Sequence, residues 1–167
     1  MLCFCYGSNM SLARLQNRVP SARCVSVATL VAHRLRFHKV GTDGSGKGDA
    51  EETGNSDDAV IGVVHEISDE EKPILDRIEG LGSGYDLKQV EVITSKGKLT
   101  CLMYAATKVD SALRPYHWYK EHVLIGASEN RLPSEYIARI ETVEAMDDPD
   151  TSRTELELAI YARRERA

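Results

Sequence analysis

The chain alternates short apolar runs with amphipathic segments, and the two periods predict where strands and helices lie. The first apolar run, Leu2 to Tyr6, predicts a buried strand. It breaks at Gly7-Ser8-Asn9, and Ser11 to Arg18 follows with the spacing of a helix. Because glycine has no Cβ, the backbone at this turn can come close to another group. We therefore expect a strand–turn–helix whose turn presents backbone N–H groups to an anionic or carbonyl oxygen.

Two more strands are predicted before residue 70. Arg23 to Val31 alternates with a period of two, and Leu35 and Phe37 extend this strand. Ala59 to Ile67 is continuously apolar except for Gly62. A glycine inside a strand often marks a place where another backbone passes close.

The segment between these strands, Gly41 to Asp58, is rich in Gly, Ser, Asp and Glu, and we expect a long mobile loop. Its first residues have the spacing of a phosphate-binding Walker loop. However, Gly48 stands where the magnesium-binding Ser or Thr would be, and the residues that follow do not form an apolar helix. The sequence therefore does not support a nucleotide site here.

A helix is predicted next, with Ser68 as its N-cap and Ile74, Leu75 and Ile78 on one face. Glu79 follows at its C-terminal end. The partial negative charge of a helix C-terminus disfavours a carboxylate by about 0.3 kcal/mol or more. Glu79 is therefore either a solvated helix-end residue or one that is kept there for a function.

The remaining elements are a hairpin and further helices. Tyr85 to Thr94 and Leu99 to Ala106 alternate on either side of a Ser-Lys-Gly-Lys turn, which predicts a hairpin. Pro115 to Gly126 predicts a helix. Another helix is expected to begin at Pro133 with Ile137 and Ile140 inward. Together these segments predict an α+β fold with a mixed, partly closed sheet.

The last part of the chain gives a weaker pattern. Met146 to Thr151 is an acidic linker, and the apolar residues after it fit a strand as well as a helix: Leu156, Leu158 and Ile160. We divide the chain into a domain of residues 1–145 and a linker and tail of residues 146–167. The basic tail residues Arg163, Arg164 and Arg166 are expected to fray.

Composition limits the class of protein. A chain of 167 residues is long enough for one domain with its own core. The net charge of −5 gives no electrostatic footprint for nucleic acid or an anionic membrane. No apolar run reaches transmembrane length, and Met1 leads directly into the first strand without room for a signal peptide. We expect a cytoplasmic protein, and a homodimer stays open.

The cysteines and histidines do not suggest a metal centre. Cys3 and Cys5 share one face of a strand, and Cys24 and Cys101 lie in other strands, so free buried thiols are expected. The chain has no zinc-type Cys/His spacing. His117 and His122 are five residues apart, whereas a metal-binding pair on a helix is four apart.

Several stretches, in this order, resemble the γ-glutamylcyclotransferase family. They are Tyr6-Gly7-Ser8-Asn9, Leu75-Asp76-Arg77-Ile78-Glu79-Gly80, Ser83-Gly84-Tyr85, Tyr119-Lys120 and Gly126-Ala127-Ser128-Glu129-Asn130-Arg131-Leu132-Pro133. Together they cover residues 2 to 145. The resemblance implies a small barrel-like sheet with surrounding helices. It also implies conversion of γ-glutamyl peptides into 5-oxoproline and a free amino acid or amine, without a cofactor.

The same resemblance assigns the site residues. Glu79 occupies the position of the family's catalytic base. The residues expected to bind substrate are the cradle Cys5, Tyr6, Gly7, Ser8 and Asn9 and the pocket tyrosines Tyr85, Tyr104 and Tyr119. Tyr119 is expected to donate a hydrogen bond to the substrate. The alternative for each of these tyrosines is a structural role, in which the ring is buried in the core and its hydroxyl bonds to the protein and not to substrate.

Alternatives to this function stay open. In one alternative the reaction is the same, but the substrate is glutathione or a γ-glutamylamine such as γ-glutamyl-lysine. In the other, the protein has no catalytic activity and only binds a small acidic ligand. A pure anion binder has no use for the extra negative charge of Glu79. A thiol hydrolase using Cys3 or Cys5 lacks a paired histidine in the sequence. The Gly41 to Asp58 segment is long and acidic, and here the chain departs from the family pattern.

Overall fold

A computed structural model describes residues 1–162, and the basic tail residues Arg163, Arg164 and Arg166 lie outside the described part. Seven strands and five helices with one short 3-10 turn follow one another along the chain. The strands are β1 (Leu2–Cys5), β2 (Arg23–Val31), β3 (His33–Val40), β4 (Gly46–Glu52), β5 (Ala59–Glu66), β6 (Tyr85–Thr94) and β7 (Gly97–Ala106). The helical elements are η1 (Ser8–Met10), α1 (Leu12–Arg18), α2 (Lys72–Glu79), α3 (His117–Glu129), α4 (Ser134–Glu141) and α5 (Thr151–Ala162).

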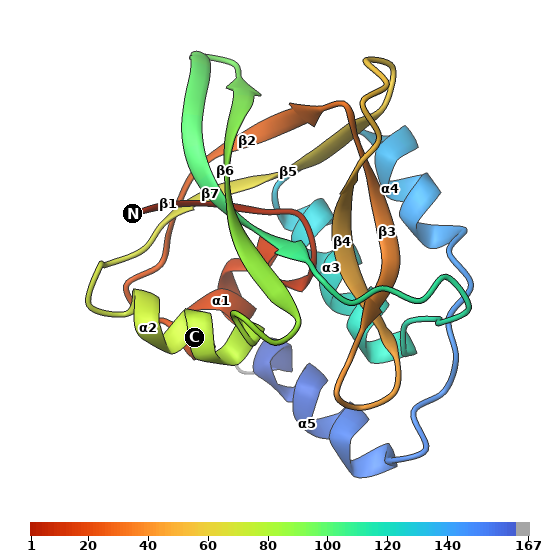
Figure 1. The fold of residues 1–167 in the computed structure, drawn as a ribbon. Coiled ribbons are helices and arrows are strands. Elements are labelled where there is room, and N and C mark those ends of the chain that lie inside the picture. Colours follow the sequence, from red (N-terminus) through yellow and green to blue (C-terminus); the bar gives the residue numbers. More distant parts are fainter. Residues whose placement is uncertain (163–167) are drawn as a thin grey trace.

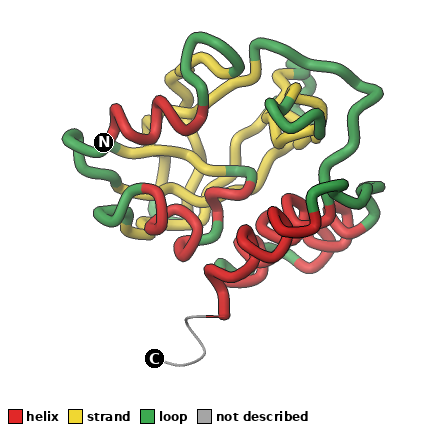
Figure 2. The backbone as a smooth tube through the Cα atoms, turned by 90° about the horizontal axis from the view of Figure 1, so that it is seen from below, coloured by secondary structure: helices red, strands yellow, loops and turns green. Residues whose placement is uncertain are grey.

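The α+β prediction with a barrel-like sheet is confirmed. Five strands close a barrel in the order β1-β5-β2-β6-β7, and the parallel pair of β1 with β7 completes it. Strands β3 and β4 form a separate two-stranded sheet beside the barrel (Figure 1). Helices α1 and α2 lie below one end of the barrel, and α3 and α4 lie on the side of β3 and β4 (Figure 1). Viewed from below, short helices lie at the left of the strands and the longer helices lie at the lower right (Figure 2).

The strand β1 divides the core because its side chains alternate between two faces. Phe4 and Tyr6 belong to the cluster inside the barrel, with Val64 and Met103. Cys3 and Cys5 point the other way, into the cluster under α1 and α2. The predicted common face of the two cysteines is thus confirmed, with their sulfur atoms 3.8 Å apart.

The prediction of a mobile loop over Gly41 to Asp58 is wrong. Gly46–Glu52 forms strand β4, which pairs along β3 from His33↔Glu52 to Val40↔Gly46. The glycines that suggested a loop are needed for close packing, because a Cβ on Gly46 would overlap the carbonyl oxygen of Phe37. Composition pointed to a loop, but the backbone ladder and burial decide the structure.

Strand β2 also differs from its prediction. The chain turns at Ala32, which has a φ of 59°, so Leu35 and Phe37 belong to β3 in the second sheet and do not extend β2. Val25, Val27 and Val31 are exposed, while Ala28 and Leu30 face the barrel interior. The register shift between Cys24 and Ser26 locally disrupts the alternation along the strand.

The helices depart from prediction mostly at their ends. Ser68 lies before α2 without capping it. Of the three apolar residues predicted to share one face of this helix, Leu75 is buried, whereas Ile74 and Ile78 are exposed. Helix α3 continues past Gly126 to Glu129, so Gly126 does not end it. This glycine instead allows close packing, because a Cβ there would lie 2.5 Å from the Ser11 nitrogen. In the last segment, whose structure the sequence left open, α5 is a helix.

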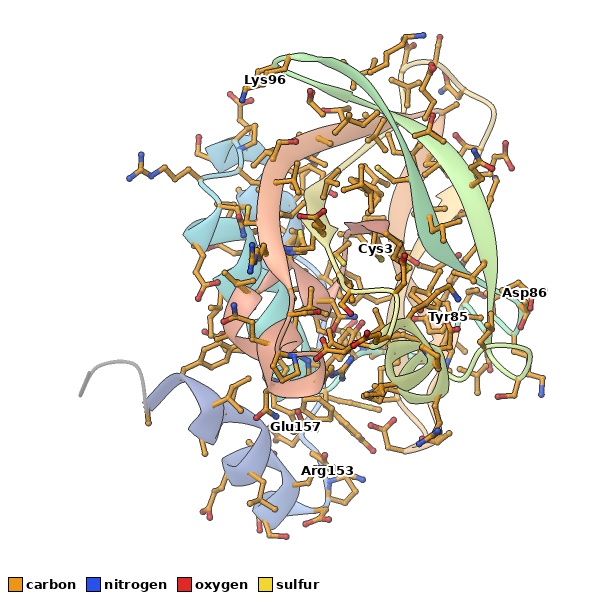
Figure 3. All side chains as sticks on the ribbon, turned by 90° about the vertical axis from the view of Figure 1, so that its left-hand side faces the viewer. Cys3, Tyr85, Asp86, Lys96, Arg153 and Glu157 are labelled. Atoms are coloured by element: carbon orange, nitrogen blue, oxygen red, sulfur yellow. The ribbon has the colours of Figure 1, made fainter. Side chains whose placement is uncertain are left out.

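Three smaller expectations concern the hairpin, α4 and the cysteines. The β6–β7 hairpin is confirmed with a shorter turn at Ser95-Lys96, and Figure 3 labels Lys96 at the end far from Tyr85. Ile140 of α4 is buried, and Ile137 is partly buried against the same cluster. Cys24 is exposed, against the expectation of buried thiols, and all four cysteines are free.

Gly62 fixes the distance between β1 and β5. A Cβ there would lie 2.9 Å from ring atoms of Phe4 and closer still to the carbonyl oxygen of Cys5. The expected passage of another backbone is confirmed. Because β1 leads directly into the Gly7 turn, Gly62 also positions that turn.

Replacing Gly62 by alanine is expected to lower the free energy of unfolding by about 3 kcal/mol, because backbone must move to admit a methyl group. Chemical denaturation measures the change. The matched control is Gly54→Ala, where φ is 71° and no atom lies within 4 Å of the added Cβ. This control is expected to lose only about 1 kcal/mol from backbone strain. Equal losses in the two variants would contradict the close packing of β1 on β5.

Candidate active site

The nine residues that the sequence singled out all line one small cavity of about 40 Å³. They come from the end of β1, from η1, from the end of α2, from the start of β6, from β7 and from α3. Phe4 and Gly48 complete the wall. The structure therefore brings Glu79 to the cavity that the Gly7-Ser8 turn also lines. The roles of the nine residues stay predictions.

The turn after β1 is held by short-range bonds. The Met10 N–H donates to the carbonyl oxygen of Gly7 at 3.0 Å, and the Ser11 hydroxyl caps α1 by accepting from the Arg14 N–H at 3.5 Å. A Cβ on Gly7 would lie 3.2 Å from the Tyr119 hydroxyl. Glycine at this position thus lets the turn approach Tyr119 closely.

Glu79 is the last residue of α2, and Gly80 turns the chain away with a φ of 72°. One oxygen of its carboxylate, Oε1, accepts from the Arg18 guanidinium at 2.8 Å and from the Asn9 amide at 2.9 Å. Arg18 also donates to the Asn9 side chain at 2.9 Å. The other oxygen, Oε2, has no hydrogen-bond partner within residues 1–162. It is free to bind a ligand.

Arg18 is a contact residue of Glu79 that the sequence did not identify. The structure pairs Glu79 with this cation, whose side chain is 21% exposed. The available signal was the position of Arg18 in the last turn of α1, where a basic residue usually complements the helix dipole. Here the side chain serves a second helix, α2, instead.

Four tyrosines line the cavity, Tyr6, Tyr85, Tyr104 and Tyr119, and two of them bind the backbone of Gly48. The Tyr85 hydroxyl donates to the Gly48 carbonyl oxygen at 2.6 Å, while the Tyr119 oxygen accepts from the Gly48 N–H at 2.8 Å. The Tyr104 hydroxyl donates to Asp76 at 2.7 Å. Burial raises the pKa of Tyr85 and of Tyr119, so both stay protonated. Tyr119 keeps its own proton to donate.

Gly48 is the second residue that the sequence did not identify. It lies in β4, in the segment predicted to be a loop, and a Cβ there would lie 3.1 Å from the Tyr119 hydroxyl and 3.5 Å from the Cα of Gly7. The next residue, Asp49, is buried and accepts from the Ala106 N–H at 2.9 Å, which ties β4 to β7. The second sheet thus supplies one wall of the cavity.

The small cavity adjoins a wider cleft of about 450 Å³, and the two share Ser8, Glu79, Tyr85 and Tyr119. The charged residues that line the cleft are Arg14, Arg18, Lys39, Lys47, Arg77, Glu79 and Glu157. Cations therefore outnumber anions, which favours an anionic ligand.

Helix α5 reaches this cleft through a buried cluster. Arg14 donates to His122 Nε2 at 2.7 Å and also to Glu157, and His122 Nδ1 lies 2.7 Å from the Tyr161 hydroxyl. The same Nε2 lies 3.2 Å from Glu157 Oε2. Because an arginine only donates and its contact is the shorter one, we assign Nε2 as the acceptor and His122 as neutral. Burial lowers the pKa of His122 to about 4. Glu157 and Arg153 both lie on α5 (Figure 3).

The acidic segment before α5 is also tied down. Asp148 accepts from the indole of Trp118 at 2.7 Å and from Arg153 at 2.5 Å and 2.6 Å. Trp118 lies on α3, so these bonds connect residues 146–162 to the rest of the chain. The division of the chain into a domain of residues 1–145 and a tail stays a prediction. The bonds of Asp148 connect the tail to the domain.

Metal-binding side chains do not gather in the part of the chain that the structure describes. Within residues 1–162, no three His, Cys, Asp or Glu side chains are placed to hold an ion. His117 is exposed beside Asp147, and His122 is buried. None of the described helices is long and apolar enough to span a membrane.

Comparison with known proteins agrees with this geometry. A sequence model of the AIG2-like family matches residues 59–140. The chain is 35% identical to human γ-glutamylcyclotransferase over an alignment of 157 positions that covers 87% of this chain and 80% of the human one. The bovine γ-glutamylcyclotransferase is 36% identical with the same coverage. The chain belongs to the γ-glutamylcyclotransferase family.

A solved structure named γ-glutamyl cyclotransferase superposes with a TM-score of 0.85 at 32% identity, covering 96% of this chain and 98% of the other. A human protein described as uncharacterized superposes with a TM-score of 0.80 at 33% identity, covering 87% and 89%. The barrel, the second sheet and the surrounding helices are therefore the fold of this γ-glutamylcyclotransferase family.

The His122 cluster predicts how stability depends on pH. The folded pKa of about 4 lies below the ordinary value of 6.5, so the unfolded chain binds more protons between these values. The free energy of unfolding is therefore expected to fall by about 3 kcal/mol as pH falls from 6.5 to 4. Burial also lowers the pKa of His65, which acts in the same direction.

Denaturation at pH 7, 5.5 and 4.5 checks this, with His122→Gln and the exposed His117→Gln as a matched pair. The His122→Gln variant is expected to lose part of the pH dependence, while His117→Gln keeps all of it. Identical slopes for the wild type and His122→Gln would show that His122 is not held neutral by the fold.

Proposed function

We propose that the protein is a γ-glutamylcyclotransferase, which converts γ-glutamyl peptides to 5-oxoproline and a free amino acid. The observation that carries the proposal is the Glu79 carboxylate, which lines the same cavity as the Cys5–Asn9 cradle and whose Oε2 has no hydrogen-bond partner among residues 1–162. The names of the human and bovine relatives support it.

In this reaction the substrate's own α-amine attacks its γ-carbonyl carbon. A bond forms between the α-nitrogen and the γ-carbon, and the bond from that carbon to the leaving nitrogen breaks. The five-membered ring supplies proximity, with effective molarities that reach about 10⁵ M or more. What remains for the protein is to take a proton from the α-ammonium and to return one to the leaving nitrogen.

Glu79 can do both steps. Its Oε1 is held by Arg18 and Asn9, so the carboxylate is fixed, and Oε2 can accept the proton and then donate it. Tyr119 can donate its hydroxyl proton to the γ-carbonyl oxygen as negative charge develops there. The Gly7-Ser8 turn can bind the α-carboxylate through backbone N–H groups. Cys5, Tyr6, Tyr85 and Tyr104 complete the wall.

The alternatives differ in substrate or in chemistry. Glutathione or a γ-glutamylamine would undergo the same reaction at the same Glu79. A protein that only binds a small acid would gain nothing from a carboxylate in its cavity. A thiol hydrolase would need a reactive Cys5, but the hydrogen bond with Cys3 and burial raise the pKa of the Cys5 thiol well above its ordinary value.

Incubation with a panel of γ-glutamyl dipeptides, glutathione and γ-glutamyl-lysine, with detection of 5-oxoproline, tests the function. Formation of 5-oxoproline from at least one of them is expected. If none is converted by folded protein, the proposed function is wrong. The member converted fastest identifies the substrate class.

The Glu79→Gln variant tests the mechanism. Glutamine can accept the bonds from Arg18 and Asn9 but cannot carry a proton, so kcat is expected to fall about 10²–10⁴-fold with little change in folding. Glu70→Gln, which changes an exposed carboxylate outside the cavity, is the matched control and should keep full activity. Near-normal kcat in folded Glu79→Gln protein would remove Glu79 from the mechanism.

Metal and cofactor independence also belongs to the proposal, because every step above uses groups of this chain. The reaction is an acyl transfer within one molecule, of the acyltransferase or lyase type. Prolonged dialysis against EDTA is expected to leave kcat unchanged. Loss of activity that a divalent ion restores would contradict this part of the mechanism.

Location and partners complete the proposal. We place the protein in the cytoplasm, which the four free cysteines support because a reducing compartment keeps thiols unpaired. A small-molecule γ-glutamyl substrate is the expected partner. The net charge of −5 argues against nucleic acid. A homodimer stays open.

A further inference from the structure

Lys39 is a buried cation that the mechanism above does not use. It lies on β3, is only 8% exposed and lines the cleft beside the cavity. Its ammonium has no hydrogen bond and no carboxylate within 4.0 Å among residues 1–162. A lysine is almost never buried without such a partner, because desolvating its charge costs free energy. Its position therefore needs an explanation.

The surroundings hold the ammonium in one place. The Nζ atom lies 4.7 Å from the centre of the Tyr85 ring, which is a wall of the small cavity. Gly84 leaves room for it, because a Cβ there would lie 2.9 Å from both Cε and Nζ of Lys39. Burial lowers the pKa of Lys39, while the carboxylates of Glu79 and Asp43 oppose the shift. Lys39 thus lines the cleft without a carboxylate partner among residues 1–162.

The other cations of the cleft already have partners or contact solvent. Arg18 binds Glu79, and Arg14 binds Glu157. Lys47 donates to Asp43 at 2.6 Å. Arg77 is exposed, so water hydrates it. Among the cleft residues that the structure describes, Lys39 is therefore the buried cation whose charge a ligand could neutralise.

The sizes of the two spaces indicate which part of the substrate reaches Lys39. The small cavity of about 40 Å³ has room for about three water-sized groups, as a carboxylate and its neighbouring atoms require. The rest of a γ-glutamyl peptide must extend past Glu79 and Tyr85 into the cleft. The part beyond the scissile bond is the leaving amino acid, and it carries a carboxylate of its own.

We propose that Lys39 is a specificity-determining residue that binds the carboxylate of the leaving amino acid. This inference rests on the proposed function and narrows it to γ-glutamyl compounds whose leaving amine bears a carboxylate near its nitrogen. Leaving amines without that carboxylate leave the Lys39 ammonium without an anionic partner. They are then converted with lower kcat/KM.

The test compares two substrates that differ only in this group, γ-glutamyl-alanine and γ-glutamyl-alaninamide. The wild-type protein and Lys39→Met are assayed for 5-oxoproline with both. Methionine keeps an unbranched apolar stem against Tyr85 and removes the charge. The ratio of kcat/KM for the acid to that for the amide is expected to fall about ten- to hundredfold in Lys39→Met, as loss of a charge-assisted hydrogen bond implies.

The two leaving amines differ in leaving ability, but this difference is the same for the wild type and for Lys39→Met. It therefore cancels when the acid-to-amide ratios of kcat/KM are compared between the two proteins. Lys39→Arg should keep part of the preference for the acid, and Gly84→Ala, which displaces the ammonium, should lose part of it. The matched control is Lys108→Met, an exposed lysine that does not line the cleft, and its ratio should equal that of the wild type. Thermal unfolding verifies that each variant is folded.

The outcomes separate the inference from the proposed function. Equal loss of activity on both substrates would place Lys39 at the glutamyl part or in the fold, and an unchanged ratio would show that it does not read the leaving group. Either result overturns the inference while 5-oxoproline formation still supports the function. If the wild-type protein converts neither substrate nor any member of the wider panel, the proposed function fails, and the inference with it.

Discussion

The carboxylate of Glu79 is the constraint on which the arrangement of this site depends. It lies at the C-terminal end of α2, where the helix dipole disfavours negative charge, and it is mostly removed from solvent. Arg18 and Asn9 compensate this, and they come from the end of α1 and from the turn after β1. The first strand, its turn and two helices must therefore keep fixed positions, and the closed barrel supplies that rigidity.

The second requirement is that backbone segments approach one another closely, and glycine residues allow this at several positions. Gly62 lets β1 lie against β5, and Gly48 and Gly7 let two sheets meet beside the Tyr119 hydroxyl. Tyr119 then accepts from the Gly48 N–H, and Tyr85 donates to the Gly48 carbonyl oxygen. Because buried peptide groups need partners, this arrangement satisfies the backbone while the two rings form the cavity wall. Packing and the candidate chemistry thus use the same side chains.

The sequence predicts some strands of the fold directly, whereas it predicts the site residues only through resemblance to a family. The strand at Leu2 to Tyr6 and the hairpin from Tyr85 to Ala106 follow from periodicity, because each buries a regular face. Glu79 and the tyrosines were reached through a family resemblance, since local pattern alone does not distinguish a site tyrosine from a core tyrosine. The structure brings them together around one cavity, which no local signal could show.

What the sequence missed depends on contacts between distant segments. Strand β4 has the composition of a loop, and it forms because β3 offers a ladder and β7 binds Asp49. Arg18 and Gly48 act through partners more than 60 residues away along the chain. The packing of α5 on α1 and α3 likewise depends on Arg14, His122 and Glu157, whose pairing no spacing reveals.

The two adjoining spaces differ in their electrostatics, and this difference fits the order of the proposed reaction. The cavity wall is built mainly from uncharged donors, so a tyrosine proton and peptide groups meet the oxygen where charge develops. The cleft carries an excess of cations, most of them already paired. Among the described residues that line the cavity, Glu79 is the one carboxylate, which is why the proposed reaction assigns proton transfer to it. The charged cleft can then hold the remainder of an anionic substrate without competing for that proton.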